Sequence, residues 1–343
     1  MKALLLRAYN EFELTDFPEP VIAPDEVLVR VKACGICGSD VHGMTGSTGR
    51  RIPPIVMGHE ASGVIARTGA AVTTWHEGDR VTFDSTVYCG DCDFCRAGRF
   101  NLCDRRCVLG VSCGDYRRHG AFADFVAVPQ RILYKLPDAV PFEQAAMVEA
   151  LSVAVHAVSR GTPKPGEFVL VIGTGMIGLL VIQVLRARGC GPIIAVDRDA
   201  GRLAEARRNG ATHTLVAGTD NLAPQIQQIA GRGGVEVTFE VVGATQPIQL
   251  AVDATRKGGR VVLVGNFTPR AEIPLQAVVS REITLLGSCS SNGEYPESLE
   301  LLASGKVNVS SLISATAPLA EGASWFERLH KMEPGLMKVV LVP

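Results

Sequence analysis

The sequence predicts an α/β protein of two domains, one an irregular all-β domain and the other built on a doubly wound parallel sheet. The chain has 343 residues, which is too long for one ordinary hydrophobic core. From Leu4 to about Pro137, short β-branched segments are separated by Gly and Pro, a pattern typical of an all-β domain. After Glu143, apolar runs alternate with longer amphipathic stretches, as in βαβ units around a parallel sheet.

The same patterns place individual elements along the chain. In the first part we expect strands at 27–31, 61–66 and 79–83, and in the second part at 168–172, 193–196, 235–239, 260–264 and 283–286. Beyond Gly287 we expect a helix over 296–303 and a closing strand over 338–342 that rejoins the first domain. The predicted domains are therefore residues 1–143 with 288–343, and residues 144–287.

Composition narrows the class of function. The formal net charge is -1, with acidic and basic residues interspersed, which argues against a nucleic-acid surface or a polybasic membrane patch. The apolar run at Met1 to Leu6 is too short for a signal peptide, and no later run approaches the length of a bilayer-spanning helix. We therefore expect a cytoplasmic protein that acts on a small solute.

Four cysteines form the strongest single signal. The chain has ten cysteines, and in a long chain without a secretion signal these indicate metal ligands and reduced thiols. A C-x2-C-x2-C-x7-C pattern in a predicted lobe over 86–106 predicts a tetrahedral zinc site whose four thiolates leave no position for substrate, so that this metal is structural. The alternative is a disulfide pair or unrelated buried thiols. The ligands of the predicted site are Cys89, Cys92, Cys95 and Cys103.

A glycine motif stands where an apolar strand turns into a helical pattern. Gly173 permits the tight turn, Gly175 lets a pyrophosphate approach the backbone, and Gly178 allows close packing of helix on strand. The helix start at Met176 and Ile177 supplies N–H groups and the positive end of the helix dipole. This context predicts a Rossmann-type dinucleotide site.

The next strand ends at Asp197, and this position predicts which dinucleotide binds. A carboxylate here can hydrogen-bond both hydroxyls of the adenosine ribose and would repel a 2'-phosphate. Arg198 and Arg202 complicate the choice, because a guanidinium near the ribose can accommodate a phosphate. The sequence nevertheless favours NAD over NADP, with a helix N-cap as the alternative role for Asp197.

Two upstream segments carry a family resemblance. Residues 34–42 read CGICGSDVH, residues 58–72 follow the pattern G-H-E-x2-G-x5-G-x2-V, and residues 78–81 read GDRV. With the four-cysteine lobe and the glycine motif in the same order, the whole chain resembles the zinc-dependent medium-chain dehydrogenase/reductase family. The resemblance implies a GroES-like β domain that carries two zinc ions, a Rossmann domain that carries NAD, and an active site in the cleft between them.

The resemblance also implies a second, catalytic zinc site. Cys37 and His59 correspond to its ligands, with Glu60 either a direct ligand or one that exchanges with water. Glu149 opens a segment similar to the E-P-L-S-V-A-x-H segment of sorbitol and other polyol dehydrogenases, which would bring it to the zinc directly or through water, although Ala150 replaces the proline. One thiolate, one imidazole and a carboxylate or water leave an exchangeable position, as Lewis-acid catalysis requires. Asp40 is a plausible partner that would orient His59.

Further roles follow from the same resemblance. Ser39 is expected to be the first member of a proton relay and His42 the outer one, with a turn residue and a solvated loop histidine as the alternatives. Val264 and Ser288, at or after the ends of two sheet strands, are expected to contact the nicotinamide part of the cofactor. Lys338 is a candidate contact for the pyrophosphate, with a solvated lysine as the alternative.

The sequence therefore predicts an NAD-dependent zinc enzyme that oxidises a secondary hydroxyl of a polyol or sugar alcohol to the ketose or ketone, reversibly. Threonine, small diols and simple alcohols remain as substrates of the same fold, because residues 287–292 have no counterpart of the arginine-tyrosine pair of sorbitol dehydrogenases. A non-catalytic nucleotide-binding relative is the alternative of a different class. By analogy with the family we expect a homotetramer, with a dimer as the second choice.

Overall fold

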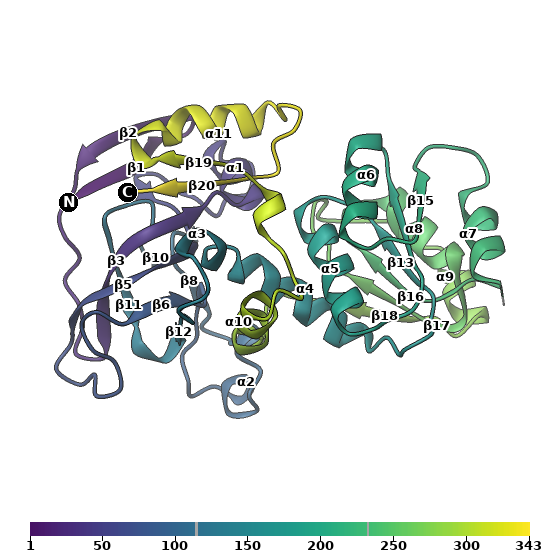
Figure 1. The fold of residues 1–343 in the computed structure, drawn as a ribbon, viewed down its shortest axis with the longest axis horizontal. Helices are drawn as coiled ribbons and strands as arrows, with labels where there is room; N and C mark the ends of the chain where they lie inside the picture. Colours follow the sequence, from purple (N-terminus) through teal and green to yellow (C-terminus); the bar gives the residue numbers. More distant parts are fainter. Residues whose placement is uncertain (114–115, 232) are drawn as a thin grey trace. The chain divides into compact units, whose positions relative to one another are not determined.

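The computed structural model describes residues 1–113, 116–231 and 233–343. The chain divides into two compact units (Figure 1). Unit 1 comprises residues 1–149, 295–303 and 309–343, and unit 2 comprises residues 150–294 and 304–308. The functional domain bounds 1–143 with 288–343, and 144–287, stay a prediction.

Unit 1 is mostly β-structure, as predicted. Its strands are β1 (Lys2–Ala8), β2 (Glu11–Asp16), β3 (Glu26–Gly35), β4 (Ile55–Val56), β5 (Glu60–Thr68), β6 (Arg80–Phe83), β7 (Thr86–Val87), β8 (Cys107–Val108), β9 (Ser112–Cys113), β10 (Tyr116–Arg117), β11 (Phe125–Pro129), β12 (Leu133–Lys135), β19 (Ile313–Pro318) and β20 (Lys338–Val342). Its helices are α1 (Gly38–Met44), α2 (Asp93–Arg96), α3 (Phe142–Ala145), α10 (Tyr295–Ala303) and α11 (Gly322–His330), with short 3-10 turns at Phe100–Leu102, Gln130–Ile132, Ser310–Leu312 and Leu319–Glu321.

The main sheet of unit 1 joins the two ends of the chain. Its strands run in the order β12-β6-β5-β3-β20-β19, and β11 also pairs with β3. The purple β3 and the yellow β20 lie side by side in Figure 1, with Leu341 opposite Cys34 and Val340 opposite Gly35. The closing strand therefore rejoins the first unit, as predicted. The β-branched and aromatic side chains of these strands bury one common core around Val29, Phe83 and Phe122.

Unit 2 contains a six-stranded parallel sheet. Its elements are α4 (Val148–Gly161), which starts in unit 1, β13 (Val169–Ile172), α5 (Met176–Ala187), β14 (Ile193–Asp197), α6 (Ala200–Asn209), β15 (His213–Val216), α7 (Leu222–Ala230), β16 (Val235–Glu240), α8 (Thr245–Ala254), β17 (Thr255–Leu263), α9 (Leu275–Ser280) and β18 (Thr284–Gly287). The strand order is β15-β14-β13-β16-β17-β18, and all neighbouring strands are parallel. This is the 3-2-1-4-5-6 order of a dinucleotide-binding sheet, which reverses between β13 and β16.

The apolar pattern of unit 2 explains both the elements that were predicted and the strand that was not. The five predicted strands correspond to β13, β14, β16, β17 and β18. β13 and the first four residues of β14 are buried, which is why their continuous apolar runs could be recognised. β15, an edge strand that starts with exposed His213, is half exposed and carries no such run, so that the sequence pattern missed it.

Candidate metal and cofactor sites

Strand pairing brings three predicted metal ligands together in unit 1. Glu60 is the first residue of β5 and pairs with Gly35 at the end of β3, so His59 and Cys37, two residues beyond Gly35, come to the same place. The ligand atoms of Cys37, His59 and Glu60 all lie within 4.8 Å of one another. His59 and Glu60 are 5 % and 1 % exposed, whereas Cys37 is half-buried. The cluster is thus a largely buried group of three donors.

Asp40 in α1 faces His59, as predicted. Its Oδ2 lies 3.3 Å from Nδ1 of His59, and neither atom has a hydrogen-bond partner elsewhere among the described residues. Burial raises the pKa of Asp40, but the charges of His59 and Arg51 lower it further, so the net shift is downward. Burial lowers the pKa of His59, but the charges of Asp40 and Cys37 outweigh the effect of burial, so the net shift in the pKa of His59 is upward. Asp40 thus stays an anion and holds Nδ1, which leaves Nε2 for a metal.

Glu60 is held by Lys338. Nζ of Lys338 donates to Oε2 of Glu60 at 2.6 Å and to the carbonyl of Ile36 at 3.2 Å. Gly35 makes room, because a Cβ at that position would lie 2.5 Å from Oε2 of Glu60. Lys338 is 3 % exposed, so the solvated-lysine alternative is wrong, whereas the pyrophosphate contact stays a prediction. Its burial follows from its place at the start of β20, in the middle of the main sheet of unit 1.

Glu149 lies in the first turn of α4 and is half-buried. It is not in the group whose donor atoms lie within 4.8 Å of one another, so the structure does not bring its carboxylate to the other three predicted ligands. Burial raises the pKa of Glu149 to about 7, with the charge of His59 opposing and those of Glu60 and Asp84 adding to the shift. The carboxyl is thus close enough to sense this cluster.

The two predicted relay residues both lie in α1, directly after Cys37. Ser39 is exposed, and its Oγ donates to Sγ of Cys37 at 3.3 Å. His42 is exposed and stands on a helix, not in the loop that its alternative role supposed. The relay itself stays a prediction.

Two buried side chains, Arg51 and Tyr295, and one half-buried side chain, Asp84, were not singled out in the sequence. Arg51 donates to Asp40. The charge of Asp84 raises the pKa of Glu149, and the charges of Asp84 and Glu149 add to the effect of burial in raising the pKa of Tyr295. Tyr295 is fully buried and stacks on Tyr134, with ring centroids 4.7 Å apart. Its hydroxyl has no hydrogen-bond partner among the described residues. No spacing or motif marks these residues, because each comes from a different part of the chain.

The four-cysteine lobe forms the second cluster. The sulfur atoms of Cys89, Cys92, Cys95 and Cys103 all lie within 4.8 Å of one another, and the sulfurs of Cys89 and Cys95 are 3.9 Å apart. A tetrahedron with Zn–S bonds of about 2.3 Å has S–S edges of about 3.8 Å. Backbone hydrogen bonds lower the pKa of Cys92 to about 6, whereas burial raises the pKa of Cys95 to about 12. This donor set fits one zinc ion, which would hold all four as thiolates.

The described cysteines outside the two clusters are free thiols. Cys34 and Cys190 are buried, Cys107 is half-buried and Cys289 is exposed, and no cysteine with a described side chain forms a disulfide. The disulfide alternative for the four-cysteine lobe is therefore wrong. The side chain of Cys113, expected to be a reduced thiol, lies outside the described part.

The glycine motif of unit 2 has the backbone that a phosphate site requires. Gly173 has φ +92°, which favours glycine. A Cβ on Gly178 would lie 1.9 Å from the carbonyl oxygen of Gly173, whereas a Cβ on Gly175 would meet nothing within 4 Å. Met176 and Ile177 open α5 and are half-buried. The open space at Gly175 in front of a helix N-terminus fits a pyrophosphate.

Asp197 ends β14 and is joined to the glycine loop. Its Oδ2 accepts from the backbone N–H and the Oγ1 of Thr174, at 2.7 and 3.0 Å, and its Oδ1 accepts from the N–H of Asp199 at 3.0 Å. The N-cap of α6 is Asp199, which accepts from the N–H of Arg202, so the N-cap alternative for Asp197 is wrong. Oδ1 of Asp197 keeps a lone pair for a ribose hydroxyl, whereas the two donors of Thr174 use both lone pairs of Oδ2.

The other predicted cofactor contacts also lie in unit 2. The side chains of Arg198 and Arg202 are exposed. Val264 directly follows β17, and its N–H donates to the carbonyl of Glu240 at 2.9 Å. Ser288 directly follows β18, and its Oγ is buried without a hydrogen-bond partner among the described residues. A polar atom left over at the carboxyl end of a sheet strand fits a ligand group there.

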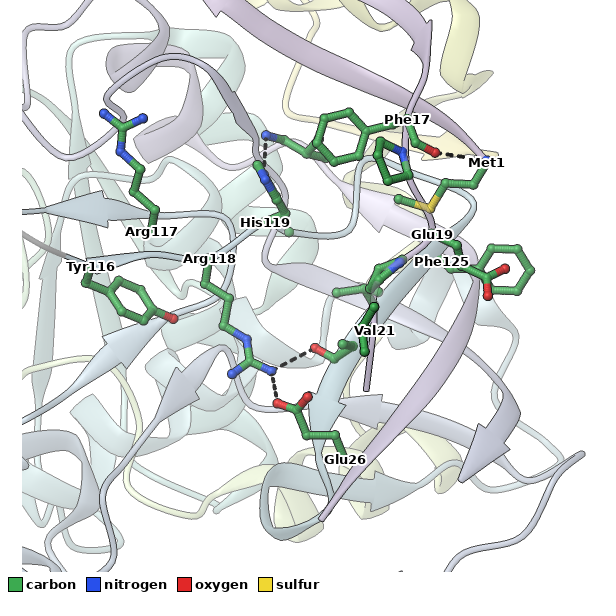
Figure 2. Close-up of a pocket in the computed structure, with 16 residues that line it drawn as sticks. Met1, Phe17, Glu19, Val21, Glu26, Tyr116, Arg117, Arg118, His119 and Phe125 are labelled. Carbon is green, nitrogen blue, oxygen red and sulfur yellow. Dashed lines mark hydrogen bonds and ion pairs between the residues drawn. The ribbon is translucent and has the colours of Figure 1, made fainter. Parts of the chain in front are cut away.

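A pocket of about 590 Å³ lies elsewhere in unit 1 (Figure 2). Met1, Phe17, Arg118 and His119 are among the residues that line it. Figure 2 shows the guanidinium of Arg118 directed at Glu26, with which it forms an ion pair. None of the predicted site residues lines this pocket. Separately, no helix in the described ranges is both long and apolar enough to cross a membrane.

Comparisons with known proteins show the family of this chain. Residues 23–138 match the model of the alcohol dehydrogenase GroES-like domain, and residues 177–304 match that of zinc-binding dehydrogenases. The chain is 34% identical to a sorbitol dehydrogenase of Bacillus subtilis (strain 168), over 100% of this chain and 97% of the relative. These matches cover the metal clusters and the sheet that follows the glycine motif.

Two similar solved structures were determined with a nicotinamide cofactor. One, described as a short chain alcohol dehydrogenase from E. coli CFT073 complexed with NADH, has a TM-score of 0.93 and 28% identity over 100% of this chain and 99% of that one. The other, a zinc-binding dehydrogenase from Sinorhizobium meliloti 1021 bound to NADP, has a TM-score of 0.90 and 31% identity over 100% and 99%. Together with the matched models and the sorbitol dehydrogenase, they place this chain: it belongs to the zinc-dependent medium-chain dehydrogenase/reductase family, in its sorbitol dehydrogenase-like branch.

Proposed function

We propose that this enzyme oxidises a secondary hydroxyl of a polyol or sugar alcohol to the ketone, with NAD+ as the acceptor, and that it runs reversibly. The carrying observation is the cluster of Cys37, His59 and Glu60, three converging donors of which two are almost fully buried. Unlike the four thiolates of the cysteine lobe, three donors leave a position for an alcohol oxygen. When bound, zinc polarises that oxygen and favours loss of its proton, and the nicotinamide takes up hydride.

The residues of unit 1 would prepare this site. Asp40 keeps His59 oriented through Nδ1, while Lys338 holds Oε2 of Glu60 and leaves Oε1 available. Ser39 presents an exposed hydroxyl next to Cys37 and would accept the proton of the substrate alcohol, with His42 as the outer member of the relay. Glu149 would contact the metal through water, since its carboxyl senses the cluster charges without joining the donor group.

The cofactor residues support NAD+ as the acceptor. Gly175 would face the pyrophosphate, Asp197 the adenosine ribose and Ser288 the nicotinamide side of the cofactor. Asp197 is an anion already fixed by Thr174, and a 2'-phosphate beside it would be repelled. The exposed Arg198 and Arg202 are the residues that could counter this repulsion, so the choice between NAD+ and NADP+ has to be measured.

The experiment is initial-rate NADH formation by the zinc-replete protein against sugar alcohols, their phosphates, small diols, threonine and primary alcohols, each with NAD+ and NADP+. NAD+-dependent turnover confined to polyols would support the proposal. Turnover of threonine or small diols alone would favour a threonine or small-diol dehydrogenase. The short side chains of Ser288, Ser290 and Ser291 support this second candidate. NAD binding without turnover of any substrate would favour a non-catalytic nucleotide-binding protein.

We include a cytoplasmic location and a homotetramer, with a dimer as the alternative, in this proposal. Cysteine thiolates such as those of the four-cysteine lobe persist as metal ligands in a reducing compartment. Light scattering coupled to size-exclusion chromatography would measure the number of subunits.

A further inference from the structure

Arg51 is a buried arginine next to the candidate metal cluster. Its side chain is 4 % exposed and pairs with Asp40, which is 0 % exposed. Nε and Nη2 of Arg51 donate to the same oxygen, Oδ1 of Asp40, at 3.0 and 2.8 Å, and Nη2 also donates to Oγ of Ser39 at 3.2 Å. Burial of a guanidinium costs several kcal/mol unless its charge is paired and its donors are used. These contacts therefore describe a specific site for this side chain.

Helix α1 provides a slot for the arginine. A Cβ on Gly43 would lie 2.2 Å from Cγ of Arg51 and 3.1 Å from its Cβ. Gly43 is buried within a helix, where glycine is less favourable than alanine by about 1 kcal/mol. The glycine at this position is explained by the stem of Arg51, which occupies the space of the missing side chain.

The two groups that Arg51 contacts each lead to a different metal ligand. Asp40 turns its other oxygen, Oδ2, to Nδ1 of His59 at 3.3 Å. The hydroxyl of Ser39 donates a hydrogen bond to Sγ of Cys37 at 3.3 Å. Cys37 and His59 lie in one cluster. The contacts therefore form a closed ring, which runs from His59 through Asp40, Arg51 and Ser39 to Cys37.

We infer that Arg51 is a positioning residue that couples the orientation of His59 to the orientation of the Ser39 hydroxyl. A lysine could neutralise Asp40, but its single nitrogen cannot reproduce the geometry in which Nε and Nη2 both donate to Asp40 while Nη2 also donates to Ser39. Arg51 donates to one lone pair of the Ser39 oxygen, and the Ser39 O–H donates a hydrogen bond to Cys37, so the second lone pair is left to accept a hydrogen bond from a bound alcohol. When Ser39 takes up the alcohol proton, its own proton turns away from Cys37 and passes to the outer member of the relay.

The kinetic part of this inference rests on the proposed function, whereas its metal-binding part does not. The variants are Arg51→Lys, which keeps the charge, Arg51→Met, which removes it, and Gly43→Ala, which displaces the stem. Arg50→Lys, at an exposed neighbour, is the matched control. The first measurement is a Co2+ titration of metal-depleted protein followed by visible absorption, because the bands of bound Co2+ report ligand geometry without turnover.

The expected results separate the two arms of the ring, namely the contacts from Arg51 through Asp40 to His59 and those from Arg51 through Ser39 to Cys37. Arg51→Met and Gly43→Ala should weaken Co2+ binding at the three-donor cluster by about 10–100-fold and change its spectrum. Arg51→Lys should bind Co2+ like the wild type but lose about 10–100-fold in kcat with little change in KM, and should show a larger rate difference between H2O and D2O. Arg50→Lys should match the wild type throughout.

Each arm can fail on its own. An unchanged Co2+ spectrum and affinity in folded Arg51→Met would overturn the link to His59, and wild-type kcat in Arg51→Lys would overturn the link to Ser39. If Arg51→Met does not fold, Gly43→Ala decides the first question. If the wild type turns over no alcohol at all, the proposed function is wrong, and the Co2+ titrations still decide the metal-binding part.

Discussion

Lys338 and Glu60 form an ion pair at 2.6 Å inside unit 1, with side chains 4 % and 1 % exposed. They are 278 residues apart in the chain and meet because β20 and β5 both pair with β3. Glu60 is a predicted metal ligand, and Lys338 neutralises its charge. Because both side chains are buried, removal of either one leaves the charge of the other unpaired.

Replacing Lys338 with Met should therefore strongly destabilise the protein. It leaves the Glu60 carboxylate buried without a counter-charge, which costs about 3–5 kcal/mol, and urea unfolding would measure the loss. Lys331→Met is the control, since Lys331 pairs with Glu327 at the surface with both side chains more than half exposed and should change stability by less than about 0.5 kcal/mol. Equal effects of the two substitutions would contradict a special role for the buried pair.

Cys37→Ser should abolish turnover and remove one of two zinc ions, while binding of NADH persists. The substitution takes away the thiolate of the three-donor cluster in unit 1, whereas the glycine motif lies in unit 2. Metal analysis and a fluorescence titration with NADH would check it. Cys103→Ser should remove the other zinc ion instead. A Cys37→Ser protein that keeps two zinc ions and full activity would refute the assignment.

Asp197→Ala should weaken NAD+ binding and relax discrimination against NADP+. Loss of hydrogen bonds to a charged carboxylate costs about 1.5–3 kcal/mol, which corresponds to an increase in the Kd for NAD+ of about 10–100-fold. Asp199→Ala is the control, because its carboxylate caps α6 and its removal should cost about 1 kcal/mol of stability without a change in cofactor preference. Unchanged preference in Asp197→Ala would leave the choice of cofactor to other residues.

Ser288→Ala should raise the KM for the cofactor by about 3–10-fold, the equivalent of one neutral hydrogen bond. Its effect on stability should be small, since Oγ of Ser288 has no partner in the described protein that would be left unsatisfied. Thermal unfolding and cofactor kinetics on the same sample separate the two effects. A loss of stability without a kinetic effect would show that Ser288 has a structural role.

The pH dependence of stability should reveal Glu149. Burial raises its pKa from 4.5 to about 7, so the folded protein favours the protonated carboxyl. Its contribution to stability is present below pH 4.5 and is lost as the pH rises through 7. In metal-free protein, Glu149→Gln should therefore gain about 2 kcal/mol over the wild type between pH 5 and pH 8. Glu13→Gln, at an exposed strand position, should show no such trend in urea unfolding.

The elements that the sequence predicted well are those with a strong local pattern. Continuous apolar runs marked β13 and β14, and the glycine motif marked the turn into α5, because strand burial and positive φ restrict residue choice at each position. Strand β19 and helix α11 lie in the final segment, where only the closing strand was expected, and half-exposed strands such as β19 give a weaker pattern. The position of Glu149 outside the donor group also could not be read from its motif.

The sequence by itself determined the chemistry that the chain can perform. Spacings of two residues between cysteines, glycines at a strand-to-helix turn and the order of motifs depend on neighbours along the chain, where local geometry sets the choice of residue. Only the tertiary structure decided how these groups are held. Lys338 reaches Glu60 through β20, and Arg51 reaches Asp40 and Ser39 across α1. Lys338 is 278 residues from Glu60 and Arg51 is 11 residues from Asp40. A buried charge leaves no local pattern because its counter-charge can come from any strand or loop that the fold brings beside it.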